Sequence, residues 1–236
     1  FILRDNKKDI SICIAFVITT MSFYLFGLQN LEKYNKKLTK KMDYKIRIVG
    51  SNINIDRFYN NIDPVLAIEE LIEISSPKEN EKIIFIWPEG IVPGISQDQL
   101  KEYKWLFENK FNQNHLLAIG INSKENENQN IKYFNSFSVY DHNLNLLNSY
   151  KKINLVPFGE FLPFEKIFES IGLKTITNSF QSYSKGEERN IIDLNYYDNF
   201  SVKILPLICY EIIYSGKIFT NKSFDFIVNI SEDGWF

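Results

Sequence analysis

The longest run of apolar positions lies near the start of the chain, at residues 10–28, and contains no charged residue. At about 1.5 Å per residue, a helix of that length crosses a hydrocarbon core of about 30 Å. A cleaved signal peptide would have a shorter apolar region that ends in a small-residue cleavage site, which does not fit this segment. A buried core helix is the remaining alternative. The pattern therefore favours a transmembrane helix.

Basic residues are unevenly distributed around this apolar segment. Five lysines occur at residues 33–41, whereas Arg4, Lys7 and Lys8 precede the segment. The positive-inside rule would place the following domain in the cytoplasm. Because the chain begins with Phe1 rather than Met, we expect residues upstream and further membrane helices, which would decide the topology. We assign residues 1–30 to an N-terminal flank and transmembrane helix, and residues 31–43 to a basic linker.

Downstream of the linker, short apolar runs alternate with segments of helical periodicity. Asp63 followed by Pro64 predicts the start of an apolar-faced helix, and Ser96 with Gln99 predicts a capping box that opens another. The polar residues 123–130 predict a solvated loop. Strands are predicted at residues 44–50, 82–87, 116–121, 132–140, 144–150, 202–208 and 224–230, with a hairpin turn at 141–143. The alternation predicts an α/β domain over residues 44–236.

Composition narrows the possible functions of this domain. With 236 residues, 44% of them hydrophobic, the chain can bury one large core. The net charge is only -2 and both signs are mixed along the chain, so nucleic acid is not an expected partner. We expect neither a metal nor an organic cofactor, because no metal-ligand spacing and no phosphate-cradling glycine loop is visible. His115 and His142 stand in polar contexts and are expected at the surface.

Two polar segments follow predicted strands, which is where α/β proteins place their sites. Glu89 comes after the strand at residues 82–87 and can serve as a general base, the alternative being a solvated turn residue. Lys152 and Glu160 stand at the two ends of an apolar, proline-containing loop. A lysine there can donate hydrogen bonds to a developing oxyanion or lower the pKa of a neighbouring thiol. A surface ion pair is the alternative.

A third segment contains Cys209, directly after the predicted buried strand at residues 202–208. A cysteine at the end of such a strand, about to enter a helix, has an environment that lowers the thiol pKa and exposes the sulfur as a nucleophile. A structural cysteine is the alternative. The other cysteine, Cys13, lies in the apolar run far away in sequence, so we expect Cys209 to be a free thiol rather than part of a disulfide.

The order of the three motifs, W-P-E, then Y-x-K-x-x-L-V-P-F-G-E, then C-Y-E, resembles the signature of the nitrilase (carbon–nitrogen hydrolase) superfamily. The resemblance implies an αββα sandwich with Glu89 as general base, Lys152 as the oxyanion-stabilising lysine and Cys209 as nucleophile. Lys152 is preferred to its neighbour because it stands eight residues before the glutamate of the F-G-E motif. Supporting roles are implied for Glu160, Tyr210 and Glu211.

Within that superfamily, L-V-P-F-G-E-F-L-P together with a preceding apolar helix resembles the apolipoprotein N-acyltransferases, which are integral membrane enzymes of bacteria. Residues 229–231 are similar to the family's strand after the cysteine. The resemblance implies transfer of an acyl chain from a phospholipid to the N-terminal amine of a diacylated lipoprotein through a cysteine thioester. It also implies the bacterial inner membrane as the location, with the catalytic domain on the periplasmic side.

The sequence departs from this family in two regions. Residues 50–53 read G-S-N-I where the family has Q-G-N-I, and Phe58 stands where a tryptophan is usual. The chain ends at G-W-F, residues 234–236, whereas the family continues, so we expect a sandwich that is incomplete at its C-terminus. Two other functions stay open. One is hydrolysis of a small amide or nitrile by the same triad, and the other is an inactive membrane-anchored remnant.

Overall fold

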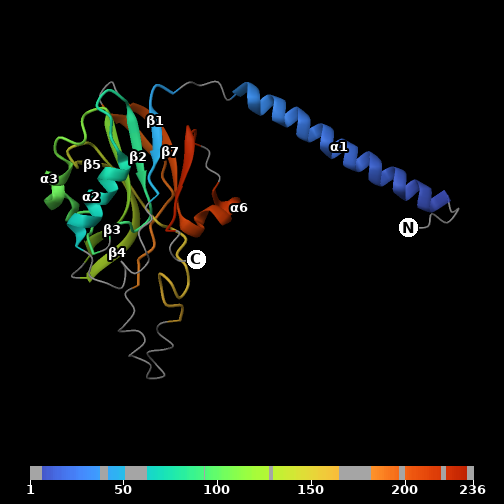
Figure 1. Ribbon diagram of the computed structural model, residues 1–236. Coiled ribbons are helices and arrows are strands. Elements are labelled where there is room, and N and C mark those ends of the chain that lie inside the picture. Colours follow the sequence, from blue (N-terminus) through green and yellow to red (C-terminus); the bar gives the residue numbers. More distant parts are fainter. Residues whose placement is uncertain are drawn as a thin grey trace. The chain divides into compact units, whose positions relative to one another are not determined.

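The computed structural model describes residues 7–37, 42–50, 63–92, 94–127, 130–164, 182–196, 200–218 and 222–232 (Figure 1). The chain divides into two compact units, Phe1–Asp43 and Tyr44–Phe236. Three segments that the sequence analysis singled out lie outside the described residues. They are the segment at residues 51–53, Phe58, and the last residues 234–236.

The first unit contains one long helix, α1, which spans Lys7–Lys37. Within it, the 26-residue segment Lys8–Lys33 is long and apolar enough to cross a membrane, and none of it is buried by the protein. Three hydroxyl side chains in this segment donate to carbonyl oxygens four positions earlier, those of Thr19, Thr20 and Ser22. Such bonds satisfy polar groups where water is absent. The predicted helix is therefore present as a candidate membrane span.

A five-stranded sheet forms the centre of the second unit, with strand order β1-β2-β3-β4-β5. Strands β1 to β3 are parallel, and β3, β4 and β5 are antiparallel neighbours. Both faces of β2 are buried, which explains its uninterrupted apolar run. The strands are β1 (Lys45–Ile48), β2 (Ile83–Trp87), β3 (His115–Glu127), β4 (Asn130–Tyr140) and β5 (Leu146–Lys151).

A second sheet of three strands packs against the first. Its strands are β6 (Ile192–Tyr196), β7 (Phe200–Ile208) and β8 (Phe226–Ile230), in the order β6-β7-β8. Side chains alternate between buried and exposed along β6 and the first four residues of β7, as expected for a sheet with one face against a core, whereas the last five residues of β7 are all buried. The inner faces of the two sheets share one apolar core, to which Phe137 of β4 and Ile204 of β7 belong. The sheets therefore form the central two layers of a sandwich.

Helices cover the other face of the five-stranded sheet (Figure 1). Helix α2 (Pro64–Ser75) begins as predicted, since the Asp63 side chain accepts a hydrogen bond from the Val65 N–H. A short 3₁₀ turn, η2 (Leu100–Tyr103), leads into α3 (Lys104–Phe107). After β7 come η4 (Cys209–Ile213) and α6 (Ser215–Ile218). These helices and sheets confirm the predicted α/β fold of the nitrilase type, preceded by an apolar helix.

Three local predictions were wrong or placed an element a few residues from where it begins. Residues 123–127 and Asn130 are not a loop, because β3 and β4 remain paired as far as Glu127 and Asn130; residues 128 and 129 lie outside the described residues. The polarity of these strand ends reflects exposure of their side chains. The Gln99 side chain does accept from the Ser96 N–H, but the helical turn begins only at Leu100. His115 is buried at 1% exposure, where Nδ1 accepts from the Asn112 N–H and Nε2 donates to a carbonyl.

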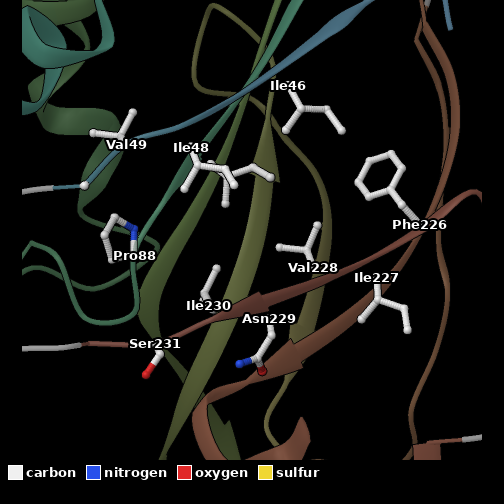
Figure 2. Close-up of a pocket in the computed structure, with 12 residues that line it drawn as sticks. Ile46, Ile48, Val49, Pro88, Phe226, Ile227, Val228, Asn229, Ile230 and Ser231 are labelled. Atoms are coloured by element: carbon white, nitrogen blue, oxygen red, sulfur yellow. The ribbon is translucent and has the colours of Figure 1, made fainter.

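An apolar groove of about 450 Å³ runs between the edge strands β1 and β8 (Figure 2). Ile46 and Ile48 form its wall on β1, and Phe226 is the first residue of its wall on β8. Pro88 and Ser231 also line the groove, at the points where β2 and β8 end. The groove therefore borders the two turns that continue into the cavity described next.

Candidate active site

A cavity of about 600 Å³ lies at the carboxyl ends of β2 and β7. It is lined by Glu89, Lys152 and Cys209, the three residues that the motifs singled out, and by their predicted supporters Glu160 and Tyr210. The third supporting residue, Glu211, is buried away from the cavity. Residues from three separate motifs thus converge on one space.

Glu89 is positioned by the turn that follows β2. This turn lies directly against Gly120 of β3, where an added Cβ would come within 2.4 Å of the Pro88 carbonyl oxygen and 2.5 Å of the Glu89 Cα. A side chain larger than hydrogen at Gly120 would displace the turn. The glycine thus permits the close approach that fixes the carboxylate, a feature that motif inspection did not reveal.

Lys152 is only 1% exposed, so it is not part of a surface ion pair. Its Nζ lies 3.0 Å from Glu160 Oε1 and 3.5 Å from Glu89 Oε1. The backbone N–H of Lys152 donates to the Asn135 carbonyl oxygen at 2.9 Å, which fixes the start of the loop against β4. The ammonium is therefore held between two carboxylates beside the cavity.

Asn135 of β4 links these two carboxylates. Its Nδ2 donates to Glu89 Oε1 at 2.6 Å and to Glu160 Oε1 at 2.7 Å. Glu160 Oε2 in turn accepts from the Val156 N–H at 2.9 Å, so the loop between Lys152 and Glu160 is closed on itself. Sequence reasoning missed Asn135, since the only local signal was a polar residue within a predicted strand.

Burial and neighbouring charge set the protonation of this cluster. Burial raises the pKa of the Glu89 carboxyl above its ordinary value, although the Lys152 ammonium and the Asn135 amide act in the opposite direction. Burial disfavours the charged form of Lys152, but Glu89 and Glu160 outweigh that effect and hold its pKa above the ordinary value. Lys152 is therefore a cation beside a carboxyl group that is poised to accept a proton.

Cys209 is the first residue of η4, directly after β7, and its backbone adopts a positive φ of 55°. A residue with a side chain rarely occupies this left-handed region, and such strain is found at functional turns. Burial, followed by the negative charge of Glu89, raises the pKa of the Cys209 thiol, while Lys152 and a hydrogen bond with Ser231 act against the shift. The predicted lowering of this thiol pKa was therefore wrong, and the thiol needs a base.

Glu211 belongs to η4, two residues after Cys209, and its side chain is fully buried. Its oxygens accept from the Tyr150 hydroxyl, from three backbone N–H groups and from Arg189 Nη2 at 2.9 Å. The three N–H groups are those of Ile153, Asn154 and Ile208. The carboxylate thus joins the loop after β5 to the end of β7. Arg189, which the motifs did not indicate, completes this network.

The part of the chain that the structure describes contains scattered His, Cys, Asp and Glu side chains. There, no group of three or more His, Cys, Asp and Glu side chains could hold a metal ion. The described lining of the cavity offers one thiol, three carboxyl groups and one ammonium.

The chain is similar in sequence to a known protein family and to curated bacterial proteins. The carbon-nitrogen hydrolase family model matches residues 45–236. Apolipoprotein N-acyltransferase of Allorhizobium ampelinum is 27% identical over 201 residues, covering 81% of this chain and 37% of the relative. That of Wigglesworthia glossinidia brevipalpis is 32% identical over 211 residues, covering 84% and 39%. The chain therefore spans about two fifths of the length of these curated relatives.

Among solved structures, an amidase of the nitrilase superfamily from Nesterenkonia is 12% identical, with a TM-score of 0.49. The match covers 82% of this chain and 67% of the amidase chain.

Proposed function

Because the chain belongs to the carbon–nitrogen hydrolase family, we propose that it transfers a fatty acyl group from a phospholipid to the N-terminal amine of a diacylated lipoprotein. The observation that carries this proposal is the convergence of Glu89, Lys152 and Cys209 on one cavity in a chain similar to apolipoprotein N-acyltransferases. Helix α1 supports a lipid donor, since it is a candidate membrane span.

In the first half of the reaction, Glu89 takes the proton of the Cys209 thiol and the thiolate attacks the ester carbonyl carbon of the phospholipid. The bond between the acyl carbon and the glycerol oxygen then breaks, and Glu89 returns the proton to that oxygen. The products are a thioester on Cys209 and a lysophospholipid. The raised pKa of the thiol makes a neighbouring base necessary for this step.

The tetrahedral intermediate carries negative charge on the former carbonyl oxygen. The Lys152 ammonium and the backbone N–H of Tyr210 are assigned to stabilise it, and each such donor contributes roughly 3 kcal/mol. Glu160 holds the Lys152 ammonium in place at 3.0 Å. Glu211 fixes the turn that presents both Cys209 and the Tyr210 N–H.

In the second half, the neutral amine of the lipoprotein attacks the thioester carbonyl carbon. Glu89 takes a proton from the attacking nitrogen and delivers it to the Cys209 sulfur as the carbon–sulfur bond breaks. An amide and the free thiol result, so the enzyme returns to its starting state. The proposal places this reaction at the bacterial inner membrane, with the catalytic domain on the periplasmic side, because the matched relatives are bacterial apolipoprotein N-acyltransferases.

A second candidate is a C–N hydrolase in which water replaces the lipoprotein amine and a small amide replaces the lipid. The same triad and the same family support it, since one site can serve several acyl acceptors. The role of α1 distinguishes the two. Deletion of residues 10–28 should abolish the use of lipid substrates and leave hydrolysis of a soluble amide intact.

The direct test uses the detergent-solubilised chain with phosphatidylethanolamine and a synthetic peptide that begins with diacylglyceryl-cysteine. Mass spectrometry should detect an N-acylated peptide with the native protein and none with Cys209→Ala. The same preparation is assayed for ammonia release from a set of small amides. Ammonia release without peptide acylation would favour the hydrolase, and neither product from folded protein would favour an inactive remnant.

A further inference from the structure

A second, polar pocket adjoins the catalytic cavity, and the reaction outlined above gives it no role. It has a volume of about 370 Å³ and shares Gly94, Asn122 and Tyr183 with the lining of the cavity. The two spaces are therefore neighbours with a common wall. A molecule whose reacting carbonyl group lies at Cys209 can extend past Asn122 and Tyr183 into this pocket.

Tyr183 is held at the boundary between the two spaces by backbone hydrogen bonds. Its N–H donates to the Glu160 carbonyl oxygen at 2.7 Å, and the N–H of Ser184 donates to the Tyr133 carbonyl oxygen at 2.6 Å. The Asn122 side chain hydrogen-bonds the Tyr183 hydroxyl and lowers its pKa, as a donor does, but burial outweighs this effect and raises the pKa. The hydroxyl therefore keeps its proton near neutral pH and can donate a hydrogen bond to a bound molecule.

Other groups in the polar pocket are also donors. Gln99 Oε1 accepts from the Ser96 N–H at 3.1 Å and from the Ser96 hydroxyl at 2.7 Å, so the other end of this amide, Nε2, offers donors only. Lys124 Nζ lies 3.0 Å from Asp98, and this single ion pair does not use all three N–H groups of the ammonium. No carboxylate is among the described residues that line the pocket. The pocket therefore suits a ligand that is rich in hydrogen-bond acceptors.

Among the parts of the proposed substrates, the phosphate of the acyl donor has this chemistry. A phosphodiester is negatively charged, and its oxygens only accept hydrogen bonds. It is attached to the same glycerol that leaves when the thioester forms, so a phosphate site has to adjoin the catalytic cavity. The acyl chain would leave the donors of the pocket without partners, at a cost in free energy, and the amine of the acceptor is itself a donor.

We propose that the polar pocket binds the phosphate of the acyl donor, and that Tyr183 is a specificity-determining residue for phospholipid. The Tyr183 hydroxyl donates to a phosphate oxygen together with Gln99 and Lys124, while the ester carbonyl group lies at Cys209. This inference rests on the proposed acyl transfer and deepens it, because it names the part of the donor that the protein recognises.

The test compares donors that present the same ester and differ in the headgroup. The full chain in detergent is incubated, in phosphate-free buffer, with phosphatidylethanolamine, with phosphatidylglycerol or with diacylglycerol that carries the same acyl chains. Intact mass follows thioester formation on Cys209, and the ratio of the rate constants measures recognition of the headgroup. A fourth donor, p-nitrophenyl butyrate, shows whether the thiol reacts at all.

Both phospholipids should acylate the native chain about 10-fold to 100-fold faster than diacylglycerol does, because hydrogen bonds to a charged group are strong. Tyr183→Phe removes only the hydroxyl and should lower this preference about 10-fold. Lys124→Met should lower it roughly 2-fold to 5-fold, since that side chain is 35% exposed. Tyr103→Phe in η2 and Lys132→Met, at a side chain that is 46% exposed on β4, are matched controls and should keep the native preference.

Several results would overturn the inference and leave the acyl-transfer proposal intact. One is equal use of phospholipid and diacylglycerol by the native chain, and another is a preference confined to phosphatidylethanolamine, which would assign recognition to the ethanolamine group. Equal losses with all three lipids in Tyr183→Phe would assign a structural role to Tyr183. Equal rates that fall for all three lipids when inorganic phosphate is added would assign the pocket to the free ion.

Other outcomes would reach the proposed function as well. Reaction of folded native protein with p-nitrophenyl butyrate but with none of the lipids would reject the lipid donor together with this inference. No adduct on Cys209 with any of the four donors would overturn acyl transfer itself.

Discussion

Two buried ion pairs lie close to the candidate nucleophile, and they differ in what surrounds them. Lys152 and Glu160 are 3.0 Å apart, and Arg189 and Glu211 are 2.9 Å apart. All four side chains are at most 11% exposed. By distance and burial alone the two pairs are alike, so neither quantity identifies the pair that takes part in chemistry.

The partners of each pair reveal the difference. Glu211 accepts from a hydroxyl, three backbone N–H groups and Arg189, and it does not appear among the described residues that line the cavity. Lys152 faces the cavity together with Glu160, and a second carboxylate, Glu89, approaches its ammonium to 3.5 Å. The Arg189 pair therefore holds two segments together, whereas the Lys152 pair presents charge to a bound molecule.

The largest expected effect concerns the base at the Lys152 pair. Glu89→Gln removes the proton acceptor while keeping a similar shape, and the thiol that it serves has a raised pKa. Thioester formation from phosphatidylethanolamine should fall by roughly 10²-fold to 10⁴-fold, which is the usual contribution of a general base. Quenched-flow mass spectrometry would measure the rate. A variant that retained more than about a tenth of native activity would contradict the assignment of Glu89 as base.

The next effect concerns stability at the Arg189 pair. Arg189→Met leaves the Glu211 carboxylate buried without its cation, which should lower the free energy of unfolding by about 3–5 kcal/mol. Chemical denaturation of the full chain in detergent would measure the change. Lys203→Met is the matched control. Lys203 of β7 forms an ion pair with Asp193 of β6, but both of these side chains are 46% exposed. Similar losses for both variants would show that burial of the Arg189 pair carries no special stabilisation.

A smaller effect is expected on the pH dependence of activity, through the pKa of Glu89 beside the Lys152 pair. Asn135 donates to the charged form of Glu89 and so lowers its pKa; Asn135→Ala removes that donation and should raise the pKa further above 4.5. Because ionised Glu89 is needed, the acid limb of the kcat/KM profile should move to higher pH. Asn145→Ala removes an amide donor to Asp141 outside the cavity and should leave the limb in place. An unshifted limb in Asn135→Ala would argue against Glu89 as the titrating group.

Much of the fold and of the candidate site could be predicted from the sequence where the pattern lies within a short segment of the chain. The apolar run of β2, the Asp63 cap and the three motifs each lie within a few residues, and the structure places them as elements or as walls of the cavity. Asn135 and Arg189 gave no such signal, since each acts through partners that are far away along the chain, such as Glu89 for Asn135.

The failed predictions have a related physical cause. The sequence predicted a loop at residues 123–130 because polar side chains indicate exposure. The described part of this segment, up to Glu127 and from Asn130, is instead held by backbone pairing of two strands, which does not depend on polarity. The pKa of Cys209 was expected to fall because of its place at a strand end. The structure adds burial and the charge of Glu89, which together reverse the direction.

Intact mass measures directly whether Cys209 accepts an acyl group from a phospholipid, as proposed. The detergent-solubilised chain is incubated with phosphatidylethanolamine alone, beside Cys209→Ala and a matched variant at the other cysteine, Cys13→Ser, which lies exposed in α1. We expect a hydroxylamine-labile gain of one fatty acyl group in the native chain and in Cys13→Ser, and no gain in Cys209→Ala. An adduct that persists in Cys209→Ala, or no adduct on folded native protein, would contradict it.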